Sequence, residues 1–411
     1  MAGSPLFDEA AKRALALEPS VIAWRRDLHR HPELSNRETR TAAVVATHLA
    51  RIGLQPQTQV AYTGVVALLD TGRPGPVVAL RADMDALPVT EEVDLPFASK
   101  ARVSFNGQDV GVMHACGHDC HVAILMGVAE LLTGMRERLH GKIKFIFQPA
   151  EEGPPPGEEG GAALMIKQGV LERPTPDVIF GLHVFAGIEA GKIAYRPGPA
   201  LASADRIRIV VRGAQTHGAL PWRGVDPIVA SSQMVMALQT VVSRQVDVSL
   251  EPAVLSIGSI HGGVRDNIIP DQVEMLGTLR TFNEDMRRDI HRRIRTIVEH
   301  TSLSMGASAE VFFDNAYPVT HNDEPLTQRM LPTLKRVAGA QNVLLGQKIT
   351  GYEDFSYYQQ RIPGFFYFVG ITPAGSGKAA PNHSPRFFVD ESALRLGVQS
   401  LAQLALDYLE G

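Results

Sequence analysis

The sequence predicts an α/β protein whose main sheet is mostly parallel, flanked by helices, and interrupted by a smaller ferredoxin-like α+β domain. Three observations predict this class. Short apolar runs typical of buried parallel strands alternate with amphipathic helical segments along much of the chain. A central stretch departs from that alternation and has the order of elements found in ferredoxin-like domains. The chain has 411 residues, which suits two or three domains.

Four apolar runs are the predicted buried strands of the main sheet. Segments with helical spacing of their apolar residues lie between and around these runs, of which Val122–Leu132 is an example. The strands are expected at Val77–Leu80, Ile143–Phe147, Val178–Leu182 and Phe365–Val369.

The central stretch predicts six elements in the order β-α-β-β-α-β. Sheet-like sequence resumes after it at Gly364–Gly370, so we interpret it as an insertion. We therefore expect a larger domain from residues 1–195 and 316–411, and an inserted domain from residues 196–315. The inserted elements are expected at Ile207–Val211, Pro227–Val242, Val254–Ile260, Val273–Leu279, Asp285–Glu299 and Ala309–Phe313.

Composition restricts the classes of function. The chain is 45% apolar and 20% charged, as in ordinary globular proteins. Its net charge of −4 argues against a nucleic acid as the main partner, because binding phosphate backbones calls for a basic face. No apolar run approaches the roughly 18 residues of a membrane span, so no membrane partner is expected. The two cysteines cannot build a disulfide framework.

The N-terminus carries no apolar signal core. A cytoplasmic location is therefore favoured, with a periplasmic one left open if a leader was removed.

Polar residues follow the predicted strands. Asp83 and Asp85 come directly after the first strand, Glu151 and Glu152 follow the second, and His183 closes the third. In open α/β sheets, ligands bind outside the carboxyl ends of the strands. We therefore expect segments distant in sequence to bring carboxylates and imidazoles to one edge of the sheet.

The segment His114–His121 packs three histidines, two cysteines and an aspartate into eight residues before a predicted helix. Thiolate and imidazole are good ligands for zinc and similar ions. Gly117 allows a tight turn, so Cys116 and His118 can face one point. The alternative is a helix N-terminus with Asp119 as its cap and incidental histidines.

The pair Glu151 and Glu152 directly follows an apolar strand, which distinguishes it from an ordinary solvated acidic loop. Neighbouring side chains of an extended chain point to opposite sides. One carboxylate could then bind a metal ion while the other faces the substrate water, a division that suits metal-assisted hydrolysis. The positions of the single histidines His183 and His383 agree with a site at the same edge of the sheet, although a lone histidine is more often structural.

Eight motifs follow one another along the chain and together are specific. From about Trp24 to the C-terminus, the sequence resembles the di-metal aminoacylase/carboxypeptidase superfamily of metallopeptidases. Within it, the sequence is most similar to the branch of hippurate hydrolases, N-acyl-L-amino acid amidohydrolases and the IAA–amino acid conjugate hydrolases of plants. The motifs are Arg81–Pro88, His114–Asp119, Gln148–Glu152, Gly181–His183, Thr216–Pro221, Asn267–Pro270, Gly351–Phe355 and Asn382–His383.

The resemblance implies a role for each candidate residue. Glu151 would be the general base, and His217 would stabilise the oxyanion, in many relatives from the partner subunit. Asn267 resembles a residue near the substrate carboxylate, and Arg265 is a further substrate-binding candidate. The implied metal ligands are Cys116, His118, Glu152, His183 and His383, with Asp85 and Asp119 expected to orient ligands from behind.

The resemblance thus implies a metal-dependent amidohydrolase that cleaves N-acyl amino acids, or related small amides and dipeptides, to a carboxylic acid and an amino acid. Two divalent ions per subunit (Zn, Mn, Co or Ni) would activate water, and Glu151 would take its proton and return it to the leaving amine. A homodimer through the inserted lid domain is also implied. Substrate choice stays open, because the loop Gly153–Gly161 and the charged residues Arg265 and Asp266 depart from most relatives.

Three alternatives remain at this point. A dipeptidase or carboxypeptidase of the same superfamily would share the residues above. Cys116 could be a nucleophile with a histidine base, but this leaves the glutamate pair, His183 and His383 unexplained. A non-catalytic metal- or peptide-binding homologue would not require Glu151.

Overall fold

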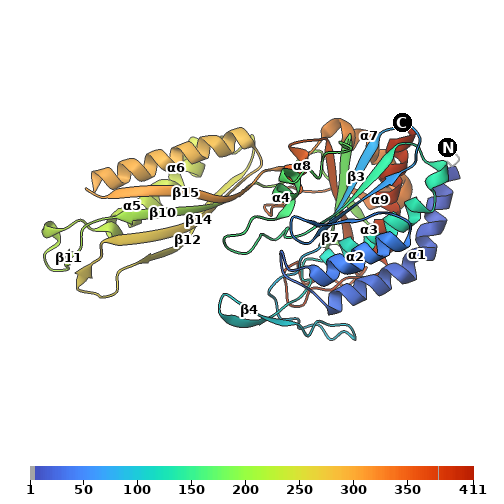
Figure 1. Cartoon of the computed structure of the whole chain (residues 1–411). Helices are drawn as coiled ribbons and strands as arrows, with labels where there is room; N and C mark the ends of the chain where they lie inside the picture. Colours follow the sequence, from blue (N-terminus) through green and yellow to red (C-terminus); the bar gives the residue numbers. More distant parts are fainter. Residues whose placement is uncertain (1–4, 378) are drawn as a thin grey trace. The chain divides into compact units, whose positions relative to one another are not determined.

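The computed structural model describes residues 5–377 and 379–411, which form two compact units (Figure 1). Two of the boundaries between them lie within a few residues of those expected from the sequence. The segment Lys348–Ser356, expected in the larger domain, belongs instead to the smaller unit, where the ring of Tyr352 lies 4.6 Å from that of Tyr317. The larger unit comprises Met1–Gly198, Asn322–Gln347 and Tyr357–Gly411, and the smaller comprises Pro199–His321 and Lys348–Ser356.

The larger unit is built on an eight-stranded sheet with the order β1-β2-β6-β3-β7-β18-β8-β17. The four central strands β6, β3, β7 and β18 are parallel neighbours, so the predicted mostly parallel sheet is confirmed. These strands contain the four predicted runs: β3 (Val77–Asp83), β6 (Lys142–Gln148), β7 (Val178–Glu189) and β18 (Gly364–Thr372). The outer strands are β1 (Gln57–Val60), β2 (Gly64–Asp70), β8 (Ile193–Tyr195) and β17 (Val343–Leu345).

Alternation along the strands determines which of their residues join the main hydrophobic core. Val178, Phe180 and Leu182 of β7 join the main hydrophobic core, as do Phe365 and Tyr367 of β18. Helices α1, α3 and α9 pack against one another and supply much of the rest of this core, with α3 buried along nearly its whole length. The helices of the larger unit are α1 (Pro5–Arg30), α2 (Thr39–Arg51), α3 (His118–Thr133), α4 (Gly161–Lys167), α7 (Glu324–Ala338) and α9 (Ala393–Glu410), and α8 (Ser356–Gln359) begins at the unit boundary.

Strand β7 is longer than predicted, and His183 does not close it. The strand continues to Glu189 because β18 pairs with it beyond this histidine. On the other side, β3 pairs with β7 only as far as Gly181. His121 occupies the open edge, where its Nε2 accepts a hydrogen bond of 2.9 Å from the Val184 amide. The Nδ1 of His121 lies 2.5 Å from Asp83 Oδ1, at the end of β3.

The smaller unit has the predicted β-α-β-β-α-β order. Its antiparallel sheet has the strand order β12-β14-β10-β15, as a ferredoxin-like topology requires. Apolar residues of both helices and of the sheet form a separate hydrophobic core. The elements are β10 (Ala204–Arg212), α5 (Pro227–Thr240), β12 (Ala253–Gly262), β14 (Gln272–Thr281), α6 (Glu284–Ser304) and β15 (Ser308–Tyr317).

Short strands lie outside the two main sheets. They are β4 (Arg102–Phe105), β5 (Gln108–Gly111), β9 (Gly198–Leu201), β11 (Thr216–His217), β13 (Ile268–Ile269) and β16 (Thr320–Asn322). Among the helices of the described ranges, none is both long and apolar enough to cross a membrane.

Lys144 fixes β6 to the turn that precedes β7. Its ammonium group donates to three backbone carbonyls, those of Val170 (2.9 Å), Glu172 (2.7 Å) and Pro174 (2.8 Å). The Lys144 side chain is buried, and so is its bond to Val170, so water is a poor substitute partner there. This bond set ties together two strands that lead into the candidate site.

We predict that Lys144→Met lowers the free energy of unfolding by about 2–3 kcal/mol, because three carbonyls lose a charged donor, one of them in a buried bond. The control is Lys142→Met on the same strand, whose ion pair with Asp70 is exposed to solvent. That change should cost less than about 0.5 kcal/mol. Denaturant unfolding of both variants measures the difference, and equal losses would contradict the structural role of Lys144.

Candidate metal centre

The five candidate ligands come from four separate segments of the larger unit, and the structure brings them together. Cys116 precedes α3 and His118 begins it, whereas Glu152 follows β6. His183 lies within β7, and His383 lies in the loop that leads toward α9.

The sulfur of Cys116 lies at the centre of the group. Its Sγ is 3.3 Å from His183 Nε2 and 3.3 Å from His383 Nε2. Two three-residue groups share this sulfur, one with His118 and His183 and the other with Glu152 and His383, and in each group the ligand atoms lie within 4.8 Å of one another. The arrangement therefore offers two adjacent sets of donors with one thiol in common.

Two of the imidazoles are oriented as metal ligands usually are. His118 Nδ1 donates to the carbonyl of Asp85 at 2.8 Å, and His183 Nδ1 donates to the carbonyl of Val184 at 2.8 Å. Each bond leaves the Nε2 lone pair free to accept, which is the usual state of a metal-binding histidine. His118 Nε2 is buried and has no hydrogen-bond partner within residues 5–377 and 379–411. A buried imidazole nitrogen without a partner is unfavourable unless something else occupies its lone pair.

The turn before α3 depends on glycine. Gly117 has a φ of +95°, and a Cβ there would lie 2.3 Å from Val184 Cγ2. Only glycine meets both requirements, the positive φ and the lack of space for a Cβ. The tight turn predicted at Gly117 is therefore present. It allows Cys116 and His118 to approach the same point.

The charges around the group favour a cation. Bonds with Cys116 and Glu152 raise the pKa of His383 to about 10. A positive charge is therefore stabilised at this position, and a metal ion would take the place of the proton. Thiolate, imidazole and carboxylate together suit zinc and other first-row divalent ions, so the donor set fits such ions.

The glutamate pair lies in a turn, not in extended chain. Ala150, just before it, has a φ of +54°. His118, Glu151 and Glu152 form a group whose ligand atoms lie within 4.8 Å of one another, and His118 Nε2 is 3.9 Å from Glu151 Oε2. The expectation that the two carboxylates point to opposite sides is therefore wrong, because the turn directs both toward His118.

Asp85 holds this turn from behind. Its Oδ1 accepts from the Glu151 amide at 3.1 Å, and its Oδ2 accepts from the Glu152 amide at 3.0 Å. Ser35 donates to the same Oδ2 at 2.7 Å. Burial opposes ionisation of Asp85, but the bonds from His118, Ser35 and the loop amide lower its pKa below the usual value.

Asp119 does not cap α3, so the alternative explanation of the His114–His121 segment is wrong on this point. The N-cap of α3 is Gly117, and no side chain caps this end of the helix. The Asp119 carboxylate is buried and accepts from Arg25 Nε at 2.8 Å, with His29 Nδ1 at 2.8 Å from the same oxygen. Burial alone would raise the pKa of Asp119, but Arg25 and His29 hold it well below its usual range.

The remaining candidates, His217, Arg265 and Asn267, belong to the smaller unit. The short strand β11 pairs with β13, and the amide of Gly218 donates to the Asn267 carbonyl at 2.8 Å. His217 and Asn267 are thus brought together on one exposed hairpin-like surface, with Arg265 nearby in sequence. Their roles in the chemistry stay predictions.

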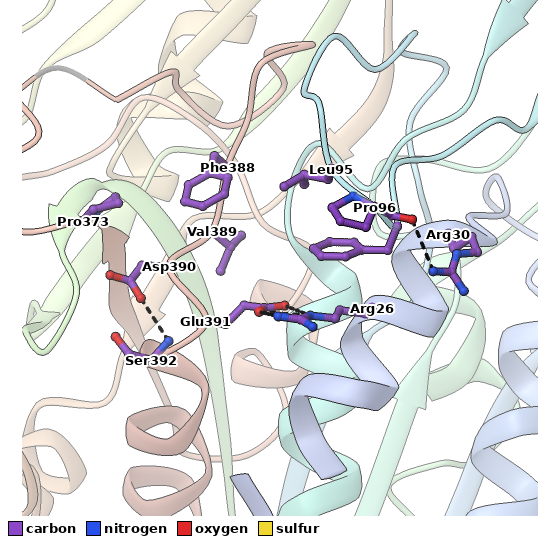
Figure 2. Close-up of a pocket in the computed structure, with 11 residues that line it drawn as sticks. Arg26, Arg30, Leu95, Pro96, Pro373, Phe388, Val389, Asp390, Glu391 and Ser392 are labelled. Carbon is purple, nitrogen blue, oxygen red and sulfur yellow. Dashed lines mark hydrogen bonds and ion pairs between the residues drawn. The ribbon is translucent and has the colours of Figure 1, made fainter. Parts of the chain in front are cut away.

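A pocket of about 640 Å³ lies in the larger unit beside α1 (Figure 2). Leu95, Pro96 and Phe388 form apolar walls, and Arg26 pairs with Glu391 through both carboxylate oxygens. None of the residues singled out in the sequence lines this pocket. The charges of Arg26 and Glu391 in this pocket neutralise each other. We therefore assign the chemistry to the cluster around Cys116 and not to this pocket.

Comparisons with known proteins agree with this assignment. The family model described as peptidase family M20/M25/M40 matches residues 79–407. A thermostable carboxypeptidase of Saccharolobus solfataricus is 40% identical, over 95% of this chain and 96% of its own length. An N-acetylcysteine deacetylase of Bacillus subtilis is 39% identical, over 96% of this chain and 98% of its own.

A solved structure from Bacillus subtilis, described as a dinuclear metal binding peptidase from the M20 family, has a TM-score of 0.79 with this chain. It is 36% identical, and the match covers 96% of this chain and 99% of that one. With a family model that spans most of the sequence and relatives that match over nearly their whole lengths, the chain belongs to peptidase family M20/M25/M40.

Proposed function

We propose that the protein is a metal-dependent amidohydrolase that cleaves N-acylated amino acids into a carboxylic acid and a free amino acid. The observation that carries this proposal is the pair of donor groups that share Cys116, with Glu151 beside them. The deacetylase and carboxypeptidase among its relatives support hydrolysis of an amide bond next to an amino acid.

The larger unit would hold two divalent ions. One would be bound by Cys116, His118 and His183, and the other by Cys116, Glu152 and His383. The dinuclear relative supports this number. Bound ions of this kind supply Lewis acidity, which activates water and polarises the amide carbonyl. Zinc, manganese, cobalt and nickel are all candidates, because such sites discriminate between metals by geometry and supply.

Glu151 would be the general base. Its backbone is fixed by Asp85, and its carboxylate lies near His118, within reach of a water at the donor groups. It would accept the proton of the attacking water and return it to the leaving amine. A cysteine nucleophile is disfavoured, because it gives no role to Glu152, His183 and His383, which the structure gathers around the Cys116 sulfur.

His217 would act in the partner subunit of a homodimer, where it stabilises the oxyanion. The smaller unit exposes apolar side chains suited to such pairing, Ile228, Val229 and Met236 on α5 and Val254 and Ile260 on the edge strand β12. Clustered exposed apolar residues and an unpaired strand edge are typical of association surfaces. Two-fold dimers are also the commonest assemblies.

The substrate class is tested by a hydrolysis screen of the purified, metal-loaded protein. N-acetyl, N-benzoyl and indoleacetyl amino acids should be cleaved faster than dipeptides. A carboxypeptidase or dipeptidase, the second candidate suggested by the 40% identical relative, would reverse that order. Hydrolysis should stop with EDTA and return with Mn²⁺ or Zn²⁺, whereas a non-catalytic homologue would show none.

Glu151→Gln should keep both metal ions but lower kcat by about 10²- to 10⁴-fold, the usual contribution of a general acid–base group. The amide of glutamine cannot take the proton of water. Metal analysis and steady-state kinetics measure the two effects. Glu159→Gln, in the same region but with an exposed side chain that pairs with Lys167, is the control and should be unaffected. A Glu151→Gln enzyme with full metal content and near-native kcat would remove Glu151 from the mechanism.

Cys116→Ser should reduce metal content and activity together, because a neutral hydroxyl is a far poorer ligand than thiolate. Cys120→Ala is the control, since Cys120 is buried but belongs to none of the donor groups found among the described residues. It should retain its metal. Loss of activity in Cys116→Ser with metals fully retained would instead support a nucleophilic cysteine.

Action of His217 in the partner subunit is tested by mixing two inactive proteins, His217→Ala and Glu151→Gln. A mixed dimer has one site in which both residues are intact, so random pairing should restore roughly a quarter of native activity. His217→Ala alone should keep its metals and lose about 10²- to 10³-fold in kcat. If subunits demonstrably exchange and no activity returns, the shared site does not exist.

A further inference from the structure

Glu38 precedes α2, but it does not cap this helix. Acidic residues at such positions ordinarily accept from the first free amides of the helix. Here Glu33 does so, because its carboxylate accepts from the amides of Arg40 (2.9 Å) and Thr41 (2.8 Å). The Glu38 side chain makes no cap bond and is completely buried. Its position therefore calls for another explanation.

The Glu38 carboxyl group reaches the turn that carries the glutamate pair. Its Oε1 accepts from the Ala150 amide at 2.9 Å, and its Oε2 accepts from the Thr63 hydroxyl at 2.5 Å. Ala150 directly precedes Glu151 and has a φ of +54°, a left-handed conformation that residues with a side chain rarely adopt. Such a conformation persists only where surrounding contacts hold it.

Two buried carboxyl groups thus bind three consecutive amides. Glu38 binds the amide of Ala150, and Asp85 binds those of Glu151 and Glu152. The amides at this turn are therefore directed away from the donor groups, while both glutamate side chains face them.

The same segment also holds the far end of the loop. Asn36, two residues before Glu38, donates through Nδ2 to Glu158 Oε2 and to the Glu159 carbonyl, each at 3.0 Å. Arg37 adds an ion pair of 2.5 Å to Glu158. The loop Gly153–Gly161 is consequently anchored at both ends by one short stretch of the chain.

We propose that Glu38 is a positioning residue for hydrolysis, which acts by holding the Ala150 amide and thereby aiming the Glu151 carboxylate. This inference rests on the proposed function, in which Glu151 is the general base. Glu38 belongs to none of the donor groups found among the described residues, so its effect would travel through the backbone of Ala150.

Both protonation states of Glu38 can do this. Burial and the nearby charge of Asp85 raise the pKa of Glu38 to about 8. In the acid form, the proton lies on Oε2 and is donated to Thr63, while Oε1 still accepts from Ala150. Glutamine has the same pattern, with its carbonyl toward Ala150 and its amide toward Thr63. Glu38→Gln should therefore preserve the hydrogen bonds to Ala150 and Thr63, whereas Glu38→Ala should remove them.

The test compares kcat, KM and metal content in Glu38→Ala and Glu38→Gln. Glu38→Ala should lose about 10- to 100-fold in kcat, the scale expected when a catalytic group is misplaced by a fraction of an ångström to one ångström. KM and the content of both metals should stay within about twofold. Glu38→Gln should keep kcat within about threefold of native. Native kcat in a folded Glu38→Ala protein, or equal loss in both variants, overturns the proposal.

Glu33→Ala is the matched control, because it weakens the same helix without touching Ala150. It should lower the melting temperature yet leave kcat native at temperatures where the protein is folded. If Glu33→Ala lowers kcat as much as Glu38→Ala, the effect is one of general stability and the proposal fails.

Two further variants keep the test decisive. If Glu38→Ala does not fold, Glu38→Asp retracts the carboxylate from Ala150 while keeping its charge, and native kcat in this variant overturns the proposal. In the Glu151→Gln background, Glu38→Ala should change the residual rate by less than about twofold, because Glu38 acts only through Glu151. A native rate in Glu151→Gln would show that Glu151 is not the general base, which contradicts the proposed function. An inactive Glu151→Gln beside a native Glu38→Ala removes only the role of Glu38.

Discussion

The site depends first on the buried carboxylate of Asp85. Its two oxygens accept from the amides of Glu151 and Glu152, and its backbone carbonyl accepts from His118 Nδ1. One residue therefore orients an imidazole and fixes the turn that carries both glutamates. A buried charge is expensive unless it is fully bonded, and Ser35 adds a further donor at 2.7 Å. The cost of burying Asp85 is offset only when these segments are correctly assembled, so the carboxylate favours a single arrangement.

Much of the architecture could be predicted from the sequence because it is encoded locally. Apolar runs of four or five residues are enough to locate the central parallel strands, and the change of pattern after about residue 196 predicts the ferredoxin-like unit. The resemblance to the di-metal superfamily is confirmed by the match to peptidase family M20/M25/M40. The five candidate ligands could be named because short motifs such as His114–Asp119 follow the order found in that superfamily, so that the resemblance implies the ligand set. The structure brings those five side chains together.

The resemblance implies Asp85 and Asp119 as residues that orient the site, but Arg25 and Glu38 could not be predicted, because their partners are distant in sequence. Arg25 binds Asp119 from 94 positions away, and Glu38 binds the Ala150 amide from 112 positions away. In the sequence, a buried arginine on α1 has the same appearance as a solvated one. The prediction that His183 closes its strand is wrong for a related reason, because the length of β7 is set by its pairing with β18. The prediction that the Glu151 and Glu152 side chains point to opposite sides is wrong, because nothing in the local sequence indicates that Ala150 is left-handed.

The order of the ligands along the chain bears on how such a protein is made. Cys116 is shared by both donor groups, but His383 follows the whole of the smaller unit in sequence. During synthesis, the group with His118 and His183 can therefore be complete while the second still lacks a donor. With the two ions proposed above, the second could be bound only after nearly all of the larger unit has been synthesised. In the proposed enzyme, full metal loading would therefore be a late step of maturation.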